Sequence, residues 1–281
     1  MYTLIVQNKY GQQLELTHNE AYVIEEIDGL DPPEATINTT RNANADGSVF
    51  NSSYVNDRQI IITMAVNSPA EANRIQLYKY FKNKYPLRLF YKNSTRDVYI
   101  DGYCQKINIE MFNKKQIAQI IIRCPEPFLK SVQDEMIDFS AIQADFEFPF
   151  SIESPIEFGE IQLNEEKDLI NSGDVETGVT ITLRARGSVT NPRIYNIETN
   201  EYFKLNITMQ QGDEIVINTE KKQKSVKLTR AGVTSNIIGN LASGSTWFQL
   251  NPGDNIFSVT ADSNPENMDA YCVLTDQFEG V

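Results

Sequence analysis

Residues 116–130 read QIAQIIIRCPEPFLK, and this stretch decides the fold of the first half of the chain. Its first nine residues alternate between the two faces of an extended strand, and one face carries Ala118, Ile120, Ile122 and Cys124. Pro125 and Pro127 then remove two backbone donors within three residues, so no ladder of sheet hydrogen bonds continues through them. The stretch predicts the last strand of a first domain, followed directly by a stiff hinge.

The distribution of charge changes across this hinge. Residues 1–131 hold 15 Lys/Arg and 14 Asp/Glu, whereas residues 132–281 hold 10 and 24. Such a step predicts two domains, 1–131 and 132–281, each long enough to bury a core of its own. The net charge of −13 disfavours a nucleic-acid binder, which needs a basic face to neutralise phosphates. We therefore expect no sequence-specific nucleic-acid binding.

Cysteine usage and hydropathy predict a soluble chain made in a reducing compartment. Cys104, Cys124 and Cys272 are odd in number and widely spaced, which favours buried free thiols over a disulfide framework or a zinc site. The N-terminus has no basic region before an apolar run, and no window approaches the ~20 apolar residues of a membrane span. We expect neither a signal peptide nor membrane insertion.

The first domain should contain short strands and a single helix. Strands are expected at Leu4–Gln7, Ala21–Ile27 and Ala35–Thr39, followed by a central strand at Asp57–Val66. A helix is expected over residues 68–85, with Ser68 as its N-cap and Glu71 completing a capping box. Its apolar stripe should consist of Ile75, Leu77, Tyr78 and Phe81.

A meander of four strands should follow the helix. The expected strands are Leu87–Tyr91, Arg96–Ile100, Tyr103–Phe112 and Lys115–Cys124. A two-residue turn at Asn113–Lys114 would pair Ile109 with Ala118, Ile107 with Ile120 and Tyr103 with Cys124. These pairs would all lie on one face of the sheet, and a four-residue loop would preserve the same phase.

Helical periodicity disappears after the hinge. Residues 179–186 alternate strictly, and further strands are expected at Tyr202–Met209, Glu214–Asn218, Ser225–Thr229, Thr246–Leu250, Ile256–Thr260 and Tyr271–Thr275, with a possible strand at Glu157–Leu163. Many short strands separated by turn residues predict a β-sandwich or jelly roll. The fold class is thus mainly β, with one helix in the first domain.

The sequence offers no catalytic, cofactor-binding or metal-binding residues. His18 is the single histidine and lies in a polar context, so neither a His-based triad nor a His pair for metal is available. Carboxylate pairs such as Glu25–Glu26 and Asp213–Glu214 are adjacent in strands, where neighbouring side chains point to opposite faces. Trp247 could stack on a sugar, but packing under a loop or against a neighbouring subunit is the favoured interpretation. We expect no enzyme.

The order of these segments resembles the distal tail protein (Dit) family of siphovirus-type bacteriophages. In the first domain the similar features are the Gly47 loop before RQIII at Arg58, RIQLYKYF from Arg74, PLRLFY from Pro86, YIDGY from Tyr99 and RCPEPF from Arg123, where the family often has Asp in place of Glu126. In the second domain they are NSGD from Asn171, the strand at Pro192, GDEIVI from Gly212 and WFQLNPGDN from Trp247.

The resemblance implies a β-sandwich domain with a helix that assembles into a homo-hexameric ring, and a galectin-like jelly-roll domain that projects from it. Such a ring is the hub of a tail tip or baseplate. It joins the tail tube protein to the tail-associated lysin, baseplate and receptor-binding proteins that reach the host. The protein would be assembled in the bacterial cytoplasm and end in the virion. Ring contacts could use edges of the Asp57–Val66 and Tyr103–Cys124 strands.

The alternative hypothesis is a carbohydrate-binding protein that recognises a bacterial surface glycan. In that case the second domain would hold the glycan through Trp247, Tyr202 or Tyr271. The two functions are compatible, since a hub can carry a lectin-like arm. Glycan binding is expected to be absent or weak.

Overall fold

The computed structural model describes residues 2–43, 46–143, 160–163 and 166–281. The chain divides into two compact units, one formed by Met1–Val132 together with Gln277–Val281 and the other by Gln133–Asp276. The expected second domain extended to residue 281. In the structure the last five residues instead return to the first unit, so the chain passes between the units twice.

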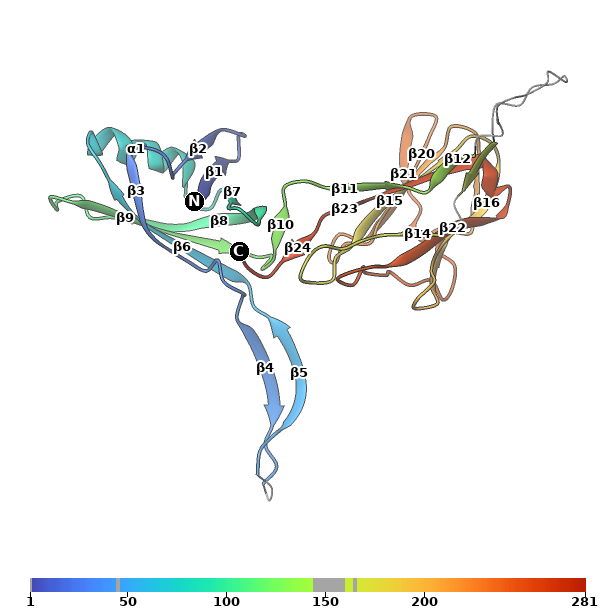
Figure 1. Cartoon of the computed structure of the whole chain (residues 1–281), viewed down its shortest axis with the longest axis horizontal. Helices are drawn as coiled ribbons and strands as arrows, with labels where there is room; N and C mark the ends of the chain where they lie inside the picture. Colours follow the sequence, from blue (N-terminus) through green and yellow to red (C-terminus); the bar gives the residue numbers. More distant parts are fainter. Residues whose placement is uncertain (1, 44–45, 144–159, 164–165) are drawn as a thin grey trace, which may run out of the picture. The chain divides into compact units, whose positions relative to one another are not determined.

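The first unit is built on one antiparallel sheet. Its strands are β1 (Thr3–Asn8), β2 (Gln13–Glu15), β3 (Tyr22–Asp28), β6 (Arg58–Val66), β7 (Pro86–Lys92), β8 (Asp97–Ile109), β9 (Gln116–Cys124), β10 (Leu129–Ser131) and β24 (Gln277–Phe278). The order is β2-β1-β7-β8-β9-β6-β3, and β10 pairs with both β8 and β24. Hydrogen bonding therefore joins the strands of the expected sandwich into one continuous sheet (Figure 1).

The core of this unit lies on the face that the sequence pattern predicted. Ala118, Ile120, Ile122 and Cys124 of β9 are all fully buried. They pack with the buried residues of β6, Ile60, Ile62 and Met64, and with those of the neighbouring strands. Burial of each such aliphatic side chain contributes roughly 1.5–3 kcal/mol, so this face holds the unit together.

Helix α1 (Ala70–Tyr80) is shorter than predicted. Pro69, not Ser68, occupies the N-cap position, and no side chain caps the helix, so the expected capping box does not form. The helix ends at Phe81 because the chain then turns through Lys84, whose φ of 69° is left-handed, into β7. Only half of the predicted stripe faces the core, since Leu77 and Phe81 are buried whereas Ile75 and Tyr78 are exposed.

The meander has three long strands where four were predicted. Gly102 lies inside β8 and joins two of the expected strands into one. A Cβ at this position would lie less than 3 Å from the side chains of Ile122 and Cys124, so the close packing requires glycine. The pairs Ile109–Ala118 and Ile107–Ile120 are as predicted. A bulge between Cys104 and Lys106 then shifts the register, so Tyr103 lies opposite Arg123 and not Cys124. The loop after β8 is also longer than the predicted two-residue turn.

The Pro125–Pro127 segment is not the boundary between the units. The next strand, β10, still belongs to the first unit, where Lys130 lies opposite Tyr99 of β8. The predicted ring edges are also wrong, because β6 lies between β9 and β3, and β9 lies between β8 and β6. The ends of the sheet order are β2 and β3.

The second unit is a sandwich of two antiparallel sheets. One has the order β11-β23-β15-β19-β20-β21, and the other has the order β14-β22-β16-β17, with β18 paired to β16. The strands are β11 (Glu135–Asp138), β14 (Lys167–Asp168), β15 (Val179–Ala185), β16 (Val189–Asn196), β17 (Glu201–Lys204), β18 (Thr208–Met209), β19 (Glu214–Asn218), β20 (Ser225–Arg230), β21 (Val233–Asn236), β22 (Ile256–Ser263) and β23 (Met268–Leu274). A separate pair joins β12 (Ser140–Gln143) to β13 (Glu160–Leu163).

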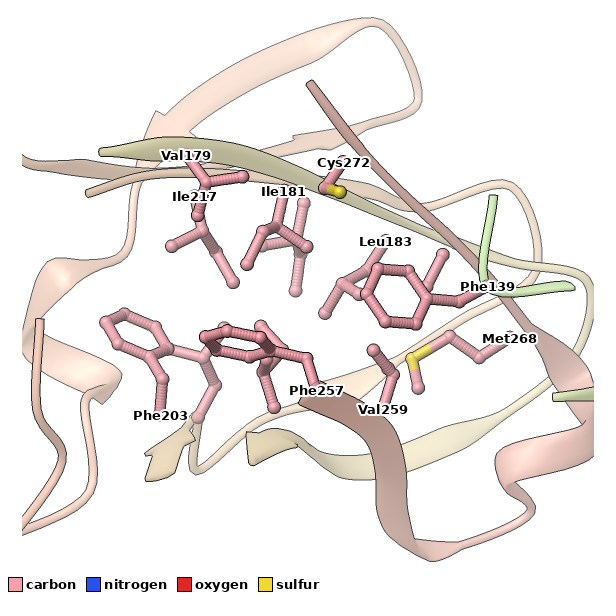
Figure 2. Close-up of a cluster of buried hydrophobic side chains, with 14 of the residues drawn as sticks. Phe139, Val179, Ile181, Leu183, Phe203, Ile217, Phe257, Val259, Met268 and Cys272 are labelled. Atoms are coloured by element: carbon pink, nitrogen blue, oxygen red, sulfur yellow. The ribbon is translucent and has the colours of Figure 1, made fainter. Parts of the chain in front are cut away.

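The core of this sandwich lies between its two sheets (Figure 2). Val179, Ile181 and Leu183 of β15 face Phe203 of β17 and Phe257 of β22, and all five are at most 1% exposed. Over residues 175–275 the helical elements are two short 3-10 turns, Ile238–Asn240 and Pro265–Asn267. The mainly-β prediction for this half is therefore confirmed.

One expected strand of the second unit is absent, and another, Tyr202–Met209, is divided into β17 and β18. Thr246–Leu250 forms no strand and contributes one isolated bridge, between Leu250 and Thr177. The strand that the resemblance placed at Pro192 is β16, although the alternation pattern alone did not predict it because Pro192 interrupts it. Asn191, with φ of 53°, turns the backbone just before this proline, so the ladder continues on both sides. The predicted strand at residues 157–163 is present from Glu160, and its earlier residues lie outside the described ones.

Among the residues described, no helix is both long enough and apolar enough to cross a membrane.

Candidate functional site

The candidate functional site is a β-hairpin of the first unit, formed by β4 (Ala35–Thr40) and β5 (Val49–Val55). These strands form a two-stranded sheet that is separate from the nine-stranded sheet. Figure 1 shows them extending away from that sheet as a long arm. A two-stranded ribbon alone is marginally stable in water, and each of its strands keeps one unpaired edge within the described chain.

The hairpin exposes large apolar side chains to solvent. The most exposed are Ile37 at 64%, Val49 at 52%, Phe50 at 61% and Tyr54 at 57%. Residues 35–55 include only two charged residues, Arg41 and Asp46. Exposed edge strands of monomeric proteins usually carry charged residues or proline, which prevent pairing with strands of other chains. Strands β4 and β5 contain neither. Such a surface is typical of an interface.

The remaining hairpin side chains are mostly Ser, Thr and Asn, and they bond across the two strands. Asn38 donates to the hydroxyl of Ser52 at 3.0 Å, and Asn51 donates to that of Thr40 at 2.6 Å. A register shift after Asn38 bends the ribbon. These cross-strand bonds hold the hairpin in shape without a core beneath it.

Arg58 fixes the base of the hairpin. Its side chain is 3% exposed. The guanidinium donates to four backbone carbonyls, those of Gly29 (2.8 Å), Asp31 (2.9 Å), Pro127 (2.6 Å) and Glu279 (2.5 Å). Burial lowers the pKa of Arg58 from its ordinary value. One side chain thus joins the segment that leads into β4, the segment before β10 and the C-terminus.

Two glycines allow the backbones to approach this arginine. Gly29 has φ of 86°, and a Cβ there would lie 2.0 Å from the carbonyl oxygen of Gln59. A Cβ on Gly280 would lie 3.1 Å from Pro32. The start of the hairpin is therefore packed against both β6 and the C-terminal segment.

A second exposed apolar feature is the tip of the β8–β9 hairpin. Phe112 is 98% exposed and Met111 is 44% exposed. Gln116, which starts β9, accepts a hydrogen bond from Arg74 of α1 at 3.4 Å, so the helix lies beside this tip. The exposed Ile75 and Tyr78 are on the same helix. Sequence analysis had assigned Phe112 to a strand and the two helix residues to the core.

The aromatic residues proposed for glycan binding do not meet at one site. Trp247 packs edge-on against Phe203, with ring centroids 5.0 Å apart, and lies against the core. Tyr202 is on β17, and its hydroxyl donates to the carbonyl of Ser243 at 3.0 Å. Tyr271 is on β23, in the other sheet, beneath the guanidinium of Arg184. These three rings cannot hold one sugar together.

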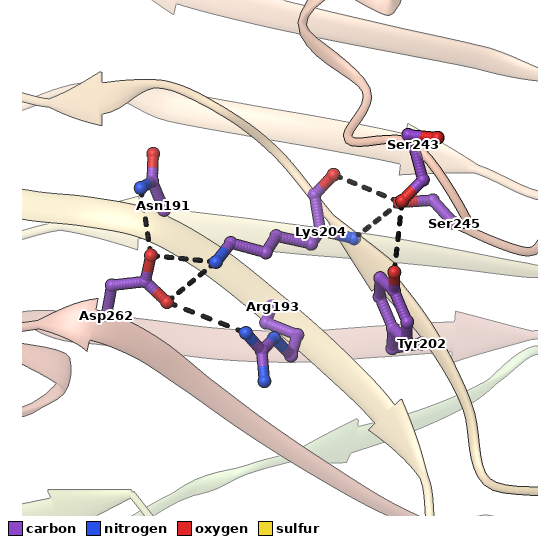
Figure 3. A network of polar contacts seen from close by, with 7 residues as sticks. All are labelled: Asn191, Arg193, Tyr202, Lys204, Ser243, Ser245 and Asp262. Atoms are coloured by element: carbon purple, nitrogen blue, oxygen red, sulfur yellow. Dashed lines mark hydrogen bonds and ion pairs between the residues drawn. The ribbon is translucent and has the colours of Figure 1, made fainter.

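The outer face of β16 and β17 carries a polar cluster that sequence reasoning missed (Figure 3). Asp262 of β22 accepts hydrogen bonds from Lys204 at 2.7 and 2.8 Å and from Asn191 at 2.9 Å. Arg193 lies 3.6 Å from the same carboxylate. These donors, first Lys204 and then Asn191, lower the pKa of Asp262. No local sequence signal marks this cluster, because its members come from three strands.

The other titratable residues that the sequence singled out have structural roles. His18 is half-exposed and its Nδ1 lies 2.9 Å from the carboxylate of Glu15. The three cysteines are buried and unpaired, as predicted, and burial raises the pKa of Cys104 to about 11 and of Cys124 and Cys272 to about 12. Such thiols stay protonated and unreactive at neutral pH. Within the described residues, no His, Cys, Asp and Glu side chains gather in the number that a metal ion requires.

Comparisons with known proteins agree with this architecture. Residues 172–271 match the family model of the siphovirus-type tail component, C-terminal domain. The SPP1 Dit protein (gp 19.1), described as a paradigm of the hub adsorption apparatus in phages that infect Gram-positive bacteria, is 13% identical. That match covers 99% of both chains with a TM-score of 0.70.

Two baseplate structures are also similar. They are the phage P2 baseplate in its activated conformation with Ca and the same baseplate with Sr. Each matching chain is 11% identical, with full coverage of both chains and a TM-score of 0.55. No curated protein matches the sequence. Residues 172–271 therefore match the siphovirus-type tail component family, and the whole chain has the fold of the SPP1 Dit protein, as the resemblance predicted.

Proposed function

We propose that this protein is the structural hub of a siphovirus tail tip, where six copies form a ring that joins the tail tube to distal adsorption proteins. The observation that carries this proposal is the β4–β5 hairpin, an almost uncharged ribbon with exposed apolar side chains and unpaired edges. The full-length similarity to a protein described as a hub supports it further.

The hairpin suits a partner that offers backbone or apolar surface. Unpaired strand edges bind other chains by adding strands, with main-chain hydrogen bonds providing affinity and side-chain pockets providing specificity. Phe50 and Tyr54 are large enough to act as anchors in such a contact. We assign this surface to contacts between neighbouring copies in the ring.

The charge distribution favours assembly through the first unit. A ring requires a head-to-tail contact in which two different surfaces of each copy meet. Residues 1–131 are close to neutral, so copies of this part can pack without strong mutual repulsion. The acidic second unit would be repelled at every such contact, and we place it outside the ring.

The ring partners in this proposal are the tail tube protein on one side and the tail-associated lysin, baseplate and receptor-binding proteins on the other. The protein acts by assembly and catalyses no reaction. It is assembled in the host cytoplasm and becomes part of the virion.

Mass measurement in solution and electron microscopy of the full chain test the proposal. We expect six-membered rings, and we expect Phe50→Ser combined with Tyr54→Ser to abolish them without unfolding the protein. Val233→Ser is the matched control, because Val233 is an apolar residue of the second unit that is 70% exposed. Rings that survive the hairpin substitutions would remove the hairpin from the interface. A protein that forms no ring, alone or with tail tube protein, would refute the hub.

The lectin hypothesis in its original form receives no support from the three named aromatic residues, because Trp247 packs against the core and Tyr271 lies in the other sheet.

A further inference from the structure

The outer face of the sheet β22-β16-β17 carries two tyrosines beside a fixed group of charges. Tyr195 lies directly opposite Tyr202, and Arg193 lies opposite Lys204. The residues between them, Ile194 and Phe203, are 1% exposed and point into the core. Because side chains alternate along a strand, the two tyrosines, Arg193 and Lys204 all lie on the outer face.

Both tyrosine rings are held in place through their hydroxyl groups. Tyr202 donates to the carbonyl of Ser243, and Tyr195 donates to the side chain of Asn200 at 2.9 Å. Gly244 allows the loop to approach, since a Cβ there would lie 2.7 Å from the Tyr202 hydroxyl. Rings fixed in this way keep their faces in one orientation, which lowers the entropy lost when a ligand packs on them.

The charges beside the tyrosines are also fixed. Lys204 is 18% exposed and bonds to both oxygens of Asp262 (Figure 3). The Asp262 carboxylate receives a third bond, from Asn191. The lysine, the aspartate and the asparagine thus satisfy one another and form a rigid border to the tyrosine pair.

Arg193 is the exception in this cluster. Its Nε is buried and has no hydrogen-bond partner within the described chain, and its distance to Asp262, 3.6 Å, is too long for a hydrogen bond. Its side chain is 38% exposed and its guanidinium lies 5.7 Å from the Tyr202 ring. The buried Nε is out of reach of a ligand, so a ligand oxygen would bond to the terminal nitrogens of this partly exposed side chain, which form an ion pair at 3.6 Å and no hydrogen bond.

On the other sheet, Arg184 lies in a similar arrangement in which the guanidinium is hydrogen-bonded within the protein. Arg184 lies 5.2 Å from the ring of Tyr271, but its Nε donates to Glu214 at 2.7 Å. Each of the two arginines therefore has a tyrosine and a carboxylate of its own beside it. They differ in that Arg184 donates a 2.7 Å hydrogen bond to its carboxylate, whereas Arg193 forms only an ion pair with Asp262 at 3.6 Å.

We propose that the outer face of β16, β17 and β22 binds an acidic sugar. The sugar ring packs against Tyr195 and Tyr202, and its carboxylate or phosphate group accepts hydrogen bonds from Arg193. Tyrosine combines an apolar ring with a polar end and suits the mixed surface of a sugar. The planar guanidinium matches a carboxylate or a phosphate with two parallel hydrogen bonds. This site does not depend on ring formation.

Titration calorimetry on the full chain tests the site with four probes: glucuronate, a glucose monophosphate, plain glucose and inorganic phosphate. We expect the two acidic sugars to bind with a Kd on the order of 1 mM, as single-sugar contacts do, and glucose to bind at least about fivefold more weakly. Arg193→Met should weaken both acidic sugars about tenfold or more. Arg184→Met, the matched control, should leave their affinities unchanged.

Tyr195→Ala distinguishes a sugar site from a site for any anion. We expect it to weaken the acidic sugars and to leave the weaker binding of inorganic phosphate unchanged. The proposal is overturned if the acidic sugars do not bind, or if both arginine variants have the same effect. It is also overturned if inorganic phosphate binds as tightly as the sugar phosphate and Tyr195→Ala changes neither. Thermal unfolding of each variant verifies that the sandwich is intact.

Discussion

Arg58 and Glu279 are separated by 221 positions, and the guanidinium of the first donates a 2.5 Å hydrogen bond to the backbone carbonyl of the second. The chain leaves the first unit after β10, forms the whole second unit and then returns to this arginine. Since Arg58 also binds the carbonyls of Gly29 and Asp31, the C-terminus and the base of the hairpin share one anchor.

Replacing this anchor should destabilise the first unit. Arg58→Met keeps most of the side-chain volume but leaves four carbonyls without their donor, and we expect a loss of about 3 kcal/mol or more in the free energy of unfolding. Arg88→Met is the control, because Arg88 is 38% exposed and paired to Asp101, and its loss should cost less than ~1 kcal/mol. Urea unfolding measures both. Equal losses would contradict the anchor role.

Deleting Gln277–Val281 should have a local effect on the first unit. Phe278 is 7% exposed, lies opposite Leu129 and packs beneath the guanidinium of Arg96 at 3.9 Å. Without it we expect faster amide exchange in β10 and in the segment before β4, with unchanged exchange in β15 and β19. Amide hydrogen exchange read by mass spectrometry gives the comparison. Protection lost evenly over both units would mean that the C-terminus has no specific role here.

The sequence predicted the parts of this fold that follow from alternation along one strand. The core face of β9 and the pairs Ile109–Ala118 and Ile107–Ile120 depend on period-two patterning and neighbouring register, and both were correct. The register failed beyond Gln105 because the bulge there leaves no compositional mark. Gly102 was left between two expected strands, although it lies inside β8, where a Cβ would meet Ile122 and Cys124.

Features that depend on distant segments could not be predicted in the same way. The return of residues 277–281 to the first unit rests on the carbonyls that Arg58 gathers from three segments. Strand β5, with the sequence VFNSSYV, has a polar centre because it covers no core, so its pattern resembled a loop. The cluster around Asp262 combines residues from three strands and has no spacing that a sequence motif could show.

Trp247→Ala should destabilise the second unit. The indole packs against Phe203 and lies beneath the ammonium of Lys224, and its removal leaves a gap beside the core. We expect a loss of about 3 kcal/mol in the free energy of unfolding, as large aromatic truncations in cores produce. Denaturant unfolding followed by near-ultraviolet circular dichroism reports it. A variant that stays equally stable but loses sugar affinity would support a lectin role for Trp247.

The stability of the second unit should fall in acid through Asp213. Its side chain is 2% exposed and bonds to Arg230 at 2.5 Å, and this bond is the main cause of the lowered pKa of Asp213. A carboxylate with a lowered pKa stabilises the fold at pH values above the unfolded pKa of about 4, and this stabilisation disappears as the pH falls through the folded value. Asp213→Asn should therefore cost on the order of 2 kcal/mol at pH 7 and little at pH 2. Denaturant unfolding of both proteins at pH 7 and pH 2 measures this difference in stability. An equal loss of unfolding free energy at the two pH values would exclude the ion pair as its cause.

The last prediction concerns the channel of the proposed ring, which must let DNA pass without holding it. The segment from Asp28 to Val55, which includes the hairpin, holds four acidic residues and one basic residue. The loop around Asp28–Glu34 is therefore a suitable wall, because acidic or neutral surfaces repel a duplex and clustered Lys/Arg would bind its phosphates through counterion release. We expect no measurable binding of duplex DNA to the assembled protein at low salt, and Asp28→Lys with Asp31→Lys and Glu34→Lys should create binding that falls steeply as salt rises. Tight, salt-sensitive binding by the unmodified protein would exclude a passive conduit, and an unchanged triple-lysine variant would show that this segment does not face the channel.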